Sequence, residues 1–290
     1  REVQLTAGLT HPSTIAIYDY GRTRDGVFYY AMELLRGINL LQLVGIEGPL
    51  PAPRVVHLLR QACGALAEAH QAGLIHRDIK PANLMVCIQG GIPDFLKVLD
   101  FGLVKEIGSI DREPDGPAPD APRDAALSQD GSLLGTPLYM APEAMSDPAT
   151  LDLRADLFAL GSVGYFLLTG SSPFPGRTAI EVFAMEKKGA VPVSRAAPRP
   201  VPIGLADVIG RCLSFDRQER PSAAAELDAM LEGCGAGTWS REDAQTWWAG
   251  RGLATVQASA TRREESSGGA LVVSTDERLP GSPAAALDIE

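Results

Sequence analysis

The side chains best suited to chemistry lie in one polar stretch, residues 74–83, which reads Leu-Ile-His-Arg-Asp-Ile-Lys-Pro-Ala-Asn. Asp78 is a candidate base, and Asn83 carries an amide oxygen of the kind that hard divalent cations bind. Two more motifs follow in the chain, Asp-Phe-Gly at 100–102 and Ala-Pro-Glu at 141–143. An isolated aspartate more often caps a turn or a strand end, but three motifs in this order predict a catalytic site.

The elements on either side of this stretch must hold it in place. Apolar residues at positions 55, 58, 59, 62, 66 and 69 predict a helix over 52–72, which Gly73 ends. Beyond the stretch, Leu84–Cys87 and Phe95–Leu99 are predicted strands. The turn between them contains Gly90, Gly91 and Pro93. The helix therefore leads into the polar stretch, and the strand pair leads on to the Asp-Phe-Gly motif.

The first residues predict a small sheet. Residues 1–9 predict a helix that ends at His11-Pro12, because the residue before a proline is pushed out of the helical region. β-Branched and aromatic residues at 14–20 and 27–33 predict a hairpin around Gly21–Gly26. We expect residues 34–37 to form a connector and a small helix to follow near 38–44.

The second half predicts mostly helices. Residues 153–169 are apolar all round, which predicts a buried helix that Gly170 ends. Further helices are predicted near 178–188, 204–214 and 222–232, the last with Ser222 as its N-cap. Residues 107–131, rich in Pro, Gly, Asp and Ala, predict a mobile insertion, because they can bury too little apolar surface to offset the entropy lost on ordering.

All three tryptophans, at 239, 247 and 248, flank or lie within a predicted short helix at 240–249. One interpretation packs them onto the helical part of the chain, and the other makes them a docking site for a partner. The packing interpretation is favoured. Residues 254–290 predict a disordered tail.

Composition excludes several functions. A net charge of −10 argues against a nucleic-acid surface, which needs clustered Lys and Arg, and against an anionic membrane as the main partner. No apolar run reaches the ~18 residues of a membrane span. Four scattered cysteines predict neither a zinc site nor a disulfide framework, which favours reduced thiols and a cytoplasmic location.

The motifs together resemble those of the serine/threonine protein kinases, most closely the bacterial ones, over residues 1–232. The resemblance implies a two-lobed α+β fold. Residues 1–35 would form an incomplete, β-rich upper lobe, with part of a helix and a hairpin, and residues 36–232 a mainly helical lower lobe. Residues 233–253 would be a short helical extension and 254–290 the tail.

The resemblance assigns roles in phosphoryl transfer from ATP to Ser or Thr hydroxyls of proteins. Asp78 matches the aspartate that orients the hydroxyl and accepts its proton, and Lys80 the lysine that contacts the transferring phosphoryl group. Lys80 also favours Ser/Thr over Tyr specificity. Asn83 and Asp100 match the magnesium ligands, for which manganese is an alternative metal.

The nucleotide site is implied in the same way. Met32 matches the gatekeeper position, and Glu33 and Leu35 would offer backbone groups to adenine. Met85 would form the floor of the adenine site. Core filling is the competing interpretation of both methionines. Glu2 matches the helix glutamate that pairs with a lysine on the third strand of the family's upper lobe.

Other matches are structural or regulatory. Arg77 resembles the arginine that pairs with a phosphate on the activation loop, so we expect phosphorylation between Asp100 and Glu143 to switch activity. The acceptor candidates are Ser128 and Ser132, and Thr136 matches a threonine that contacts Asp78. The remaining matches fix the loops and the lower lobe; they are His76, Phe101, Gly102, Asp156 and the buried pair Glu143 and Arg220.

The family's glycine-rich loop and third-strand lysine would precede Arg1. We therefore expect the sequence to be a fragment of a complete kinase, and the chain alone to have little or no activity. The alternatives are a pseudokinase that serves as a scaffold and, less favoured, a small-molecule phosphotransferase. The expected partners are protein substrates, with a homodimer for autophosphorylation in trans. A membrane tether elsewhere in a cytoplasmic full-length protein stays open.

Overall fold

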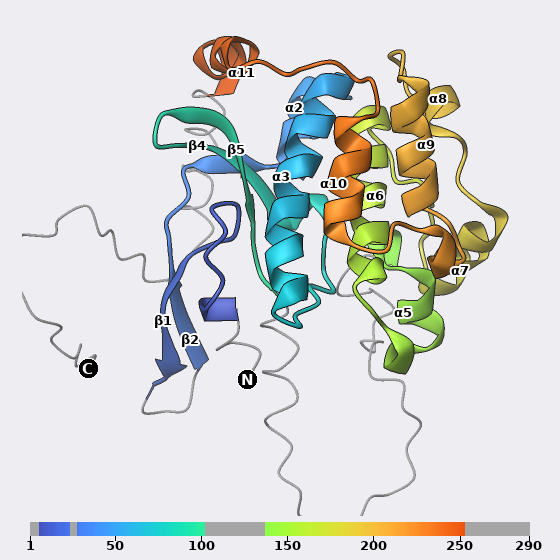
Figure 1. Ribbon diagram of the computed structural model, residues 1–290, viewed down its shortest axis with the longest axis horizontal. Helices are drawn as coiled ribbons and strands as arrows, with labels where there is room; N and C mark the ends of the chain where they lie inside the picture. Colours follow the sequence, from blue (N-terminus) through green and yellow to red (C-terminus); the bar gives the residue numbers. More distant parts are fainter. Residues whose placement is uncertain (1–5, 24–27, 102–136, 253–290) are drawn as a thin grey trace, which may run out of the picture.

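The computed structural model of the chain describes residues 6–23, 28–101 and 137–252. A part with two small sheets lies beside a mainly helical part (Figure 1). The first sheet is the antiparallel pair of β1 (Ile17–Arg22) and β2 (Phe28–Met32), so the predicted hairpin is confirmed. The second sheet has the order β3-β4-β5, all antiparallel. Its strands are β3 (Gly37–Asn39), β4 (Leu84–Gln89) and β5 (Ile92–Val98).

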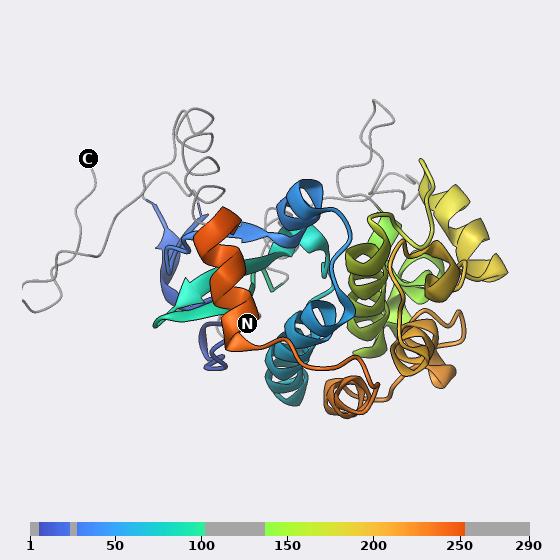
Figure 2. The ribbon, with the colours of Figure 1, turned by 90° about the horizontal axis from the view of Figure 1, so that it is seen from above.

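The helical part is built around two long helices, of which periodicity predicted the first and uniform hydrophobicity the second. They are α3 (Ala52–Gln71) and α6 (Arg154–Thr169), and α6 ends at Gly170 in a left-handed conformation with φ 80°. The other helices lie around them when the molecule is seen from above, except the last, which lies over the strands (Figure 2). These are α2 (Leu40–Glu47), α5 (Pro142–Ser146), α7 (Ala179–Lys188), α8 (Val193–Ala196), α9 (Ile203–Cys212), α10 (Ala224–Glu232) and α11 (Arg241–Trp247).

Helix α6 is buried along almost its whole length, as its uniform hydrophobicity predicted. Two glycines let its neighbours approach closely. A Cβ on Gly161 would lie 2.3 Å from the Cβ of Cys212 on α9, and a Cβ on Gly164 would lie 2.6 Å from Ile209 Cδ1. Because the Cys212 Cβ is attached directly to the α9 backbone, a larger residue at Gly161 would push α9 off the core, whereas one at Gly164 would first displace the ends of the Ile209 and Leu59 side chains.

The connector predicted over 34–37 is present only at 34–36, and the helix predicted near 38–44 begins at Leu40, because a strand occupies residues 37–39. Gly37 begins β3, which pairs with β4. A Cβ on Gly37 would lie 2.3 Å from the carbonyl oxygen of Val86, so this strand can pair only with a glycine at that position. The short strand holds α2 against the sheet that carries the catalytic stretch.

Two further details differ from the prediction. The β4–β5 turn is shorter than expected: Gly90 and Gly91 form it with φ of 54° and 77°, and Pro93 lies within β5. Helix α10 begins after Ala223, not after Ser222. The Ser222 hydroxyl and backbone N–H instead donate to the Glu226 carboxylate, both over 2.7 Å.

The predicted disordered segments, 107–131 and 254–290, lie outside the described residues, as does most of the helix predicted over 1–9. Among the residues that are described, no helix is both long enough and apolar enough to cross a membrane.

Buried Asp94 on β5 anchors the segment that follows α10. Its carboxylate has no exposed surface and accepts two hydrogen bonds from Arg54, over 2.7 and 2.8 Å. The indole N–H groups of Trp239 and Trp248 also donate to it, over 2.8 and 2.7 Å. The Trp247 ring covers the Arg54 guanidinium at 4.2 Å. The tryptophans therefore pack against α3, as the favoured interpretation predicted, and also against β5, which it did not include.

We expect Trp248→Phe to lower the free energy of unfolding by about 1–3 kcal/mol, because it removes one donor from a fully buried carboxylate. Chemical denaturation at neutral pH measures this. Trp247→Phe is the matched control, since the Trp247 indole N–H is buried without a partner among the described groups. A smaller loss for Trp248→Phe than for Trp247→Phe would contradict the role assigned to this hydrogen bond.

Candidate active site

Asp156, near the start of α6, holds the backbone of the polar stretch. Its side chain is buried and accepts the backbone N–H groups of His76 and Arg77, over 2.8 and 2.9 Å. Accepting both bends the chain sharply, and Arg77 adopts a left-handed conformation with φ 64°. His70, in the last turn of α3, contacts the same carboxylate with its Nε2 at 2.9 Å. This role of His70 was not predicted from the sequence, although the residue lies only six positions before His76.

His76 connects the polar stretch to the Asp-Phe-Gly motif. Its ring has no exposed surface; Nδ1 accepts the Asp78 backbone N–H at 3.3 Å, and Nε2 lies 2.7 Å from the Leu99 carbonyl oxygen. Because a carbonyl oxygen can only accept, the Nε2–H group of His76 donates to Leu99. The ring also contacts the Phe101 ring, with centroids 4.6 Å apart. His76 therefore packs and hydrogen-bonds, as the sequence analysis expected.

Two polar side chains converge on Asp78. Lys80 Nζ lies 2.8 Å from Asp78 Oδ2, and Asn83 Nδ2 donates to the same oxygen over 2.9 Å. Asn83 Nδ2 also donates to the Asp78 backbone carbonyl, over 2.9 Å. Asp78 and Lys80 remain partly exposed, whereas Asn83 is buried. The amide nitrogen of Asn83 is thus used to hold Asp78, which leaves its oxygen as an available ligand.

Asp100 lies beside this group. It adopts a left-handed conformation with φ 55°, and the Leu99 N–H next to it donates to the Asn83 carbonyl over 2.9 Å. Burial raises the pKa of the Asp100 carboxyl, and the nearby Asp78 adds to this while His76 and Lys80 oppose it. A positive charge such as a metal ion would offset that effect, because it favours the ionised carboxylate.

A cleft of about 420 Å³ opens on one side of Asp78. Asp78 and Lys80 line one wall, and Tyr139 and Met140 line another. The polar stretch thus faces the segment that leads into α5, where the Ala-Pro-Glu motif lies.

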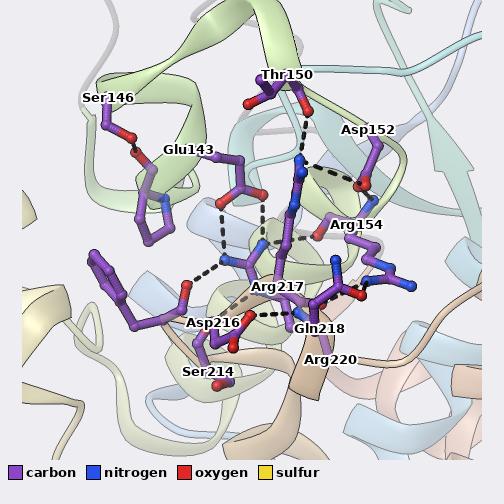
Figure 3. A network of polar contacts seen from close by, with 12 residues as sticks. Glu143, Ser146, Thr150, Asp152, Arg154, Ser214, Asp216, Arg217, Gln218 and Arg220 are labelled. Atoms are coloured by element: carbon purple, nitrogen blue, oxygen red, sulfur yellow. Dashed lines mark hydrogen bonds and ion pairs between the residues drawn. The ribbon is translucent and has the colours of Figure 1, made fainter.

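The Ala-Pro-Glu motif is anchored by an ion pair (Figure 3). Arg220 Nη1 and Nη2 donate to the two carboxylate oxygens of Glu143, over 2.6 and 2.9 Å. The Arg220 side chain is fully buried and also lies over the Phe158 ring at 4.8 Å. The pairing predicted from the sequence is present in the structure.

The four residues expected to contact a nucleotide lie on β2, on β4 and between β2 and β3. Met32 is partly exposed, and Met85 is buried on β4. The Glu33 backbone N–H donates to Ala16 over 2.9 Å, which leaves its carbonyl for a ligand. Leu35 is half-buried.

The Glu33 side chain has a partner that the sequence analysis missed. Lys97, on β5, places its Nζ 2.6 Å from Glu33 Oε1 and 3.3 Å from the Thr14 carbonyl oxygen. The same Glu33 oxygen accepts the Ala16 N–H over 2.8 Å. This cluster joins β5 to the segment between β2 and β3. The sequence feature that could have suggested this contact is a lysine, Lys97, three residues before Asp100 on a predicted strand.

Several predicted site residues cannot be placed. They lie outside the described residues and are Glu2, Gly102, Ser128, Ser132 and Thr136. Arg77 is described and exposed, but the segment with which it was expected to pair is not.

Comparison with known proteins agrees with this geometry. The protein kinase domain family matches residues 1–230. The chain belongs to the protein kinase family. It is 39% identical to the serine/threonine-protein kinase pkn3 of Myxococcus xanthus over 235 residues, 80% of this chain and 41% of that protein. It is 32% identical to PknB of Mycobacterium leprae over 236 residues, 80% of this chain and 35% of that protein.

A solved structure gives the same result for the fold. A double mutant of the PknI kinase domain of Mycobacterium tuberculosis matches with a TM-score of 0.57 and 25% identity, over 81% of this chain and 76% of that one. The two-lobed α+β kinase fold predicted from the motifs is therefore confirmed. The chain spans less than half the length of the pkn3 and PknB relatives.

The kinase residues present fit a nucleotide with magnesium. The Asn83 oxygen and the Asp100 carboxylate are hard oxygen ligands, and magnesium is commonly bound by one or two protein groups together with substrate phosphates. Such an ion would neutralise charge on the phosphates. On the protein side, the bonds from Asn83 to Asp78 and from Leu99 to Asn83 keep the two ligands in register.

In this kinase domain, Lys97→Met would leave the largely buried Glu33 carboxylate without its cation. We expect the free energy of unfolding to fall by about 3–5 kcal/mol, measured by urea denaturation. The double variant Lys97→Met/Glu33→Gln removes both charges and should recover part of the loss. If the double variant is no more stable than the single one, the two side chains are not coupled as the structure indicates.

Proposed function

We propose that the protein is an ATP-dependent serine/threonine protein kinase that transfers the γ-phosphoryl group to hydroxyls of protein substrates. One observation above all supports this: Lys80 and Asn83 both bind Oδ2 of Asp78. One carboxylate oxygen is thereby fixed, and the other, Oδ1, would receive the hydroxyl of the substrate. A base that is oriented through one oxygen can accept a proton through the other.

The neighbouring groups would each have a task in this transfer. Lys80 lies beside Asp78. It would contact the phosphoryl group during transfer, when negative charge is spread over the oxygens of that group. Asn83 and Asp100 would hold magnesium on the nucleotide. The cleft between Asp78 and Tyr139 would receive the substrate segment that carries the hydroxyl.

Adenine would bind along the residues after β2. The Glu33 N–H already donates to Ala16, so Glu33 would offer its carbonyl and Leu35 its N–H to the base. The Lys97 contact supports this arrangement, because it holds the Glu33 side chain away from the base and against β5. Met32 and Met85 would line the pocket.

Regulation and partners follow from family membership. We propose that phosphorylation of the activation segment, at Ser128 or Ser132, creates a partner for Arg77, and that Thr136 helps to seat the substrate. The kinase would act on proteins in the cytoplasm and on a second copy of itself. Trans-autophosphorylation of a catalytically dead copy by an active copy tests that last point.

Asp78→Asn should reduce phosphate transfer to a protein substrate by about 10²–10⁴-fold, because the amide cannot accept the hydroxyl proton. The assay is transfer of labelled γ-phosphate by the full-length protein, with Asp207→Asn, an exposed aspartate on α9, as the control. Both variants should melt at the temperature of the unaltered protein. Undiminished transfer by Asp78→Asn would refute the role of Asp78.

A further inference from the structure

Glu186 on α7 is a buried carboxyl group that phosphate transfer does not use. It is 1% exposed, and neither of its carboxyl oxygens has a hydrogen-bond partner among the described groups. Two other buried acids in the described chain, Asp94 and Asp156, accept several hydrogen bonds each. A buried acid without donors is costly when ionised, so Glu186 favours its protonated form.

The positive charge of Arg220 lowers the pKa of Glu186, but the donors of Arg220 are already used. Arg220 Nε donates to the Ser214 carbonyl oxygen over 2.8 Å. Nη1 donates to Glu143 Oε1 over 2.6 Å and to the Arg154 carbonyl oxygen over 3.3 Å. Nη2 donates to Glu143 Oε2 over 2.9 Å and to the Phe215 carbonyl oxygen over 3.3 Å. A guanidinium has no further N–H groups to give. Glu186 can gain Arg220 only if Glu143 yields it.

Helix α7 is placed to transmit such an exchange. It packs against α5, which carries Glu143, and against the turn Pro137–Tyr139 on the wall of the substrate cleft. On the other side, the rings of Phe183 and Phe215 meet edge to face at 5.8 Å. The Phe215 carbonyl is itself an acceptor for Arg220.

The charges around Glu186 decide its protonation. Burial raises its pKa to about 8; Arg220 lowers the pKa and Glu143 raises it. From the adjoining turn, the Tyr139 hydroxyl has a pKa of about 12 and stays neutral. Lys187 and Lys188 are exposed, and the groove beside α7 also contains Asp207, Arg211 and Glu219.

We propose that Glu186 is a proton-controlled competitor of Glu143 for Arg220. While Glu186 keeps its proton, Arg220 stays bound to Glu143 and the Ala-Pro-Glu segment stays anchored. When Glu186 releases its proton to water, its carboxylate attracts the guanidinium, weakens the bond to Glu143 and loosens the wall of the substrate cleft. Mildly alkaline pH then weakens protein-substrate binding.

The proton on Glu186 also determines whether the stability of the folded protein rises or falls with pH. An unfolded glutamate has its ordinary pKa of 4.5, whereas burial raises the pKa of folded Glu186 to about 8. The folded state therefore binds more protons between these values, and stability falls as pH rises through this window. The stabilisation relative to the ionised state is fully present below the lower value and lost above the upper one.

The test compares the full-length protein with Glu186→Gln, a neutral side chain of the same shape, between about pH 6 and about pH 9. The structural readout is hydrogen exchange of the amides in α5. We expect exchange in the unaltered protein to rise several-fold across this range, after correction for the intrinsic rate, and to stay flat in Glu186→Gln. Glu181→Gln, an exposed acid on the same helix, should behave like the unaltered protein.

A second readout, the KM for substrate, depends on the proposed kinase activity, whereas the hydrogen-exchange readout does not. The KM for a peptide substrate should rise at the alkaline end only where Glu186 is present, with KM for ATP unchanged. If Glu186→Gln fails to fold, the carboxyl carbon shift of Glu186 in the unaltered protein, followed by NMR, replaces it. Parallel exchange profiles in both proteins, or a Glu186 carboxyl that titrates near 4.5, would overturn the proposal.

Discussion

A single buried carboxylate, that of Asp156, sets the geometry on which the catalytic centre depends. It accepts two consecutive backbone N–H groups, from His76 and Arg77, and this forces Arg77 into a left-handed conformation. That conformation costs about 1–3 kcal/mol, which hydrogen bonds to a charged acceptor, worth about 1.5–3 kcal/mol each, can offset. The bend directs the His76 ring toward Leu99 and so fixes where Asp100 lies. The start of helix α6, where Asp156 lies, therefore determines the positions of the catalytic residues.

Beyond this centre, buried ion pairs join segments that are distant in the chain. Arg54 meets Asp94, Lys97 meets Glu33 and Arg220 meets Glu143. The first pair joins α3 to β5, the second joins β5 to the segment after β2, and the third joins α5 to the segment before α10. Buried pairs add little net stability, but removing one partner is costly. A shift of either segment would separate the paired charges, so these pairs oppose changes in register.

The sequence predicted those features that depend on local pattern. Helices α3 and α6 follow from periodicity and uniform hydrophobicity, and the motif order was sufficient to identify the family. The catalytic roles came from resemblance, not from pattern. Strand β3 was missed because three residues around Gly37 form a strand only when β4 lies beside them. Lys97 with Glu33, and Asp94 with the tryptophans, were missed because nothing local marks a partner dozens of residues away.

The anchoring of Trp239 and Trp248 on Asp94 has a consequence for synthesis of the chain on the ribosome. Asp94 emerges early, whereas its two indole donors lie 145 and 154 residues later. Until those residues emerge, the carboxylate and Arg54 can pair only with each other and with water. Long-range contacts of this kind form late. Completion of this face of the domain must therefore wait for residues that follow the family-matched segment, so folding during translation finishes only after residue 248 has left the exit tunnel.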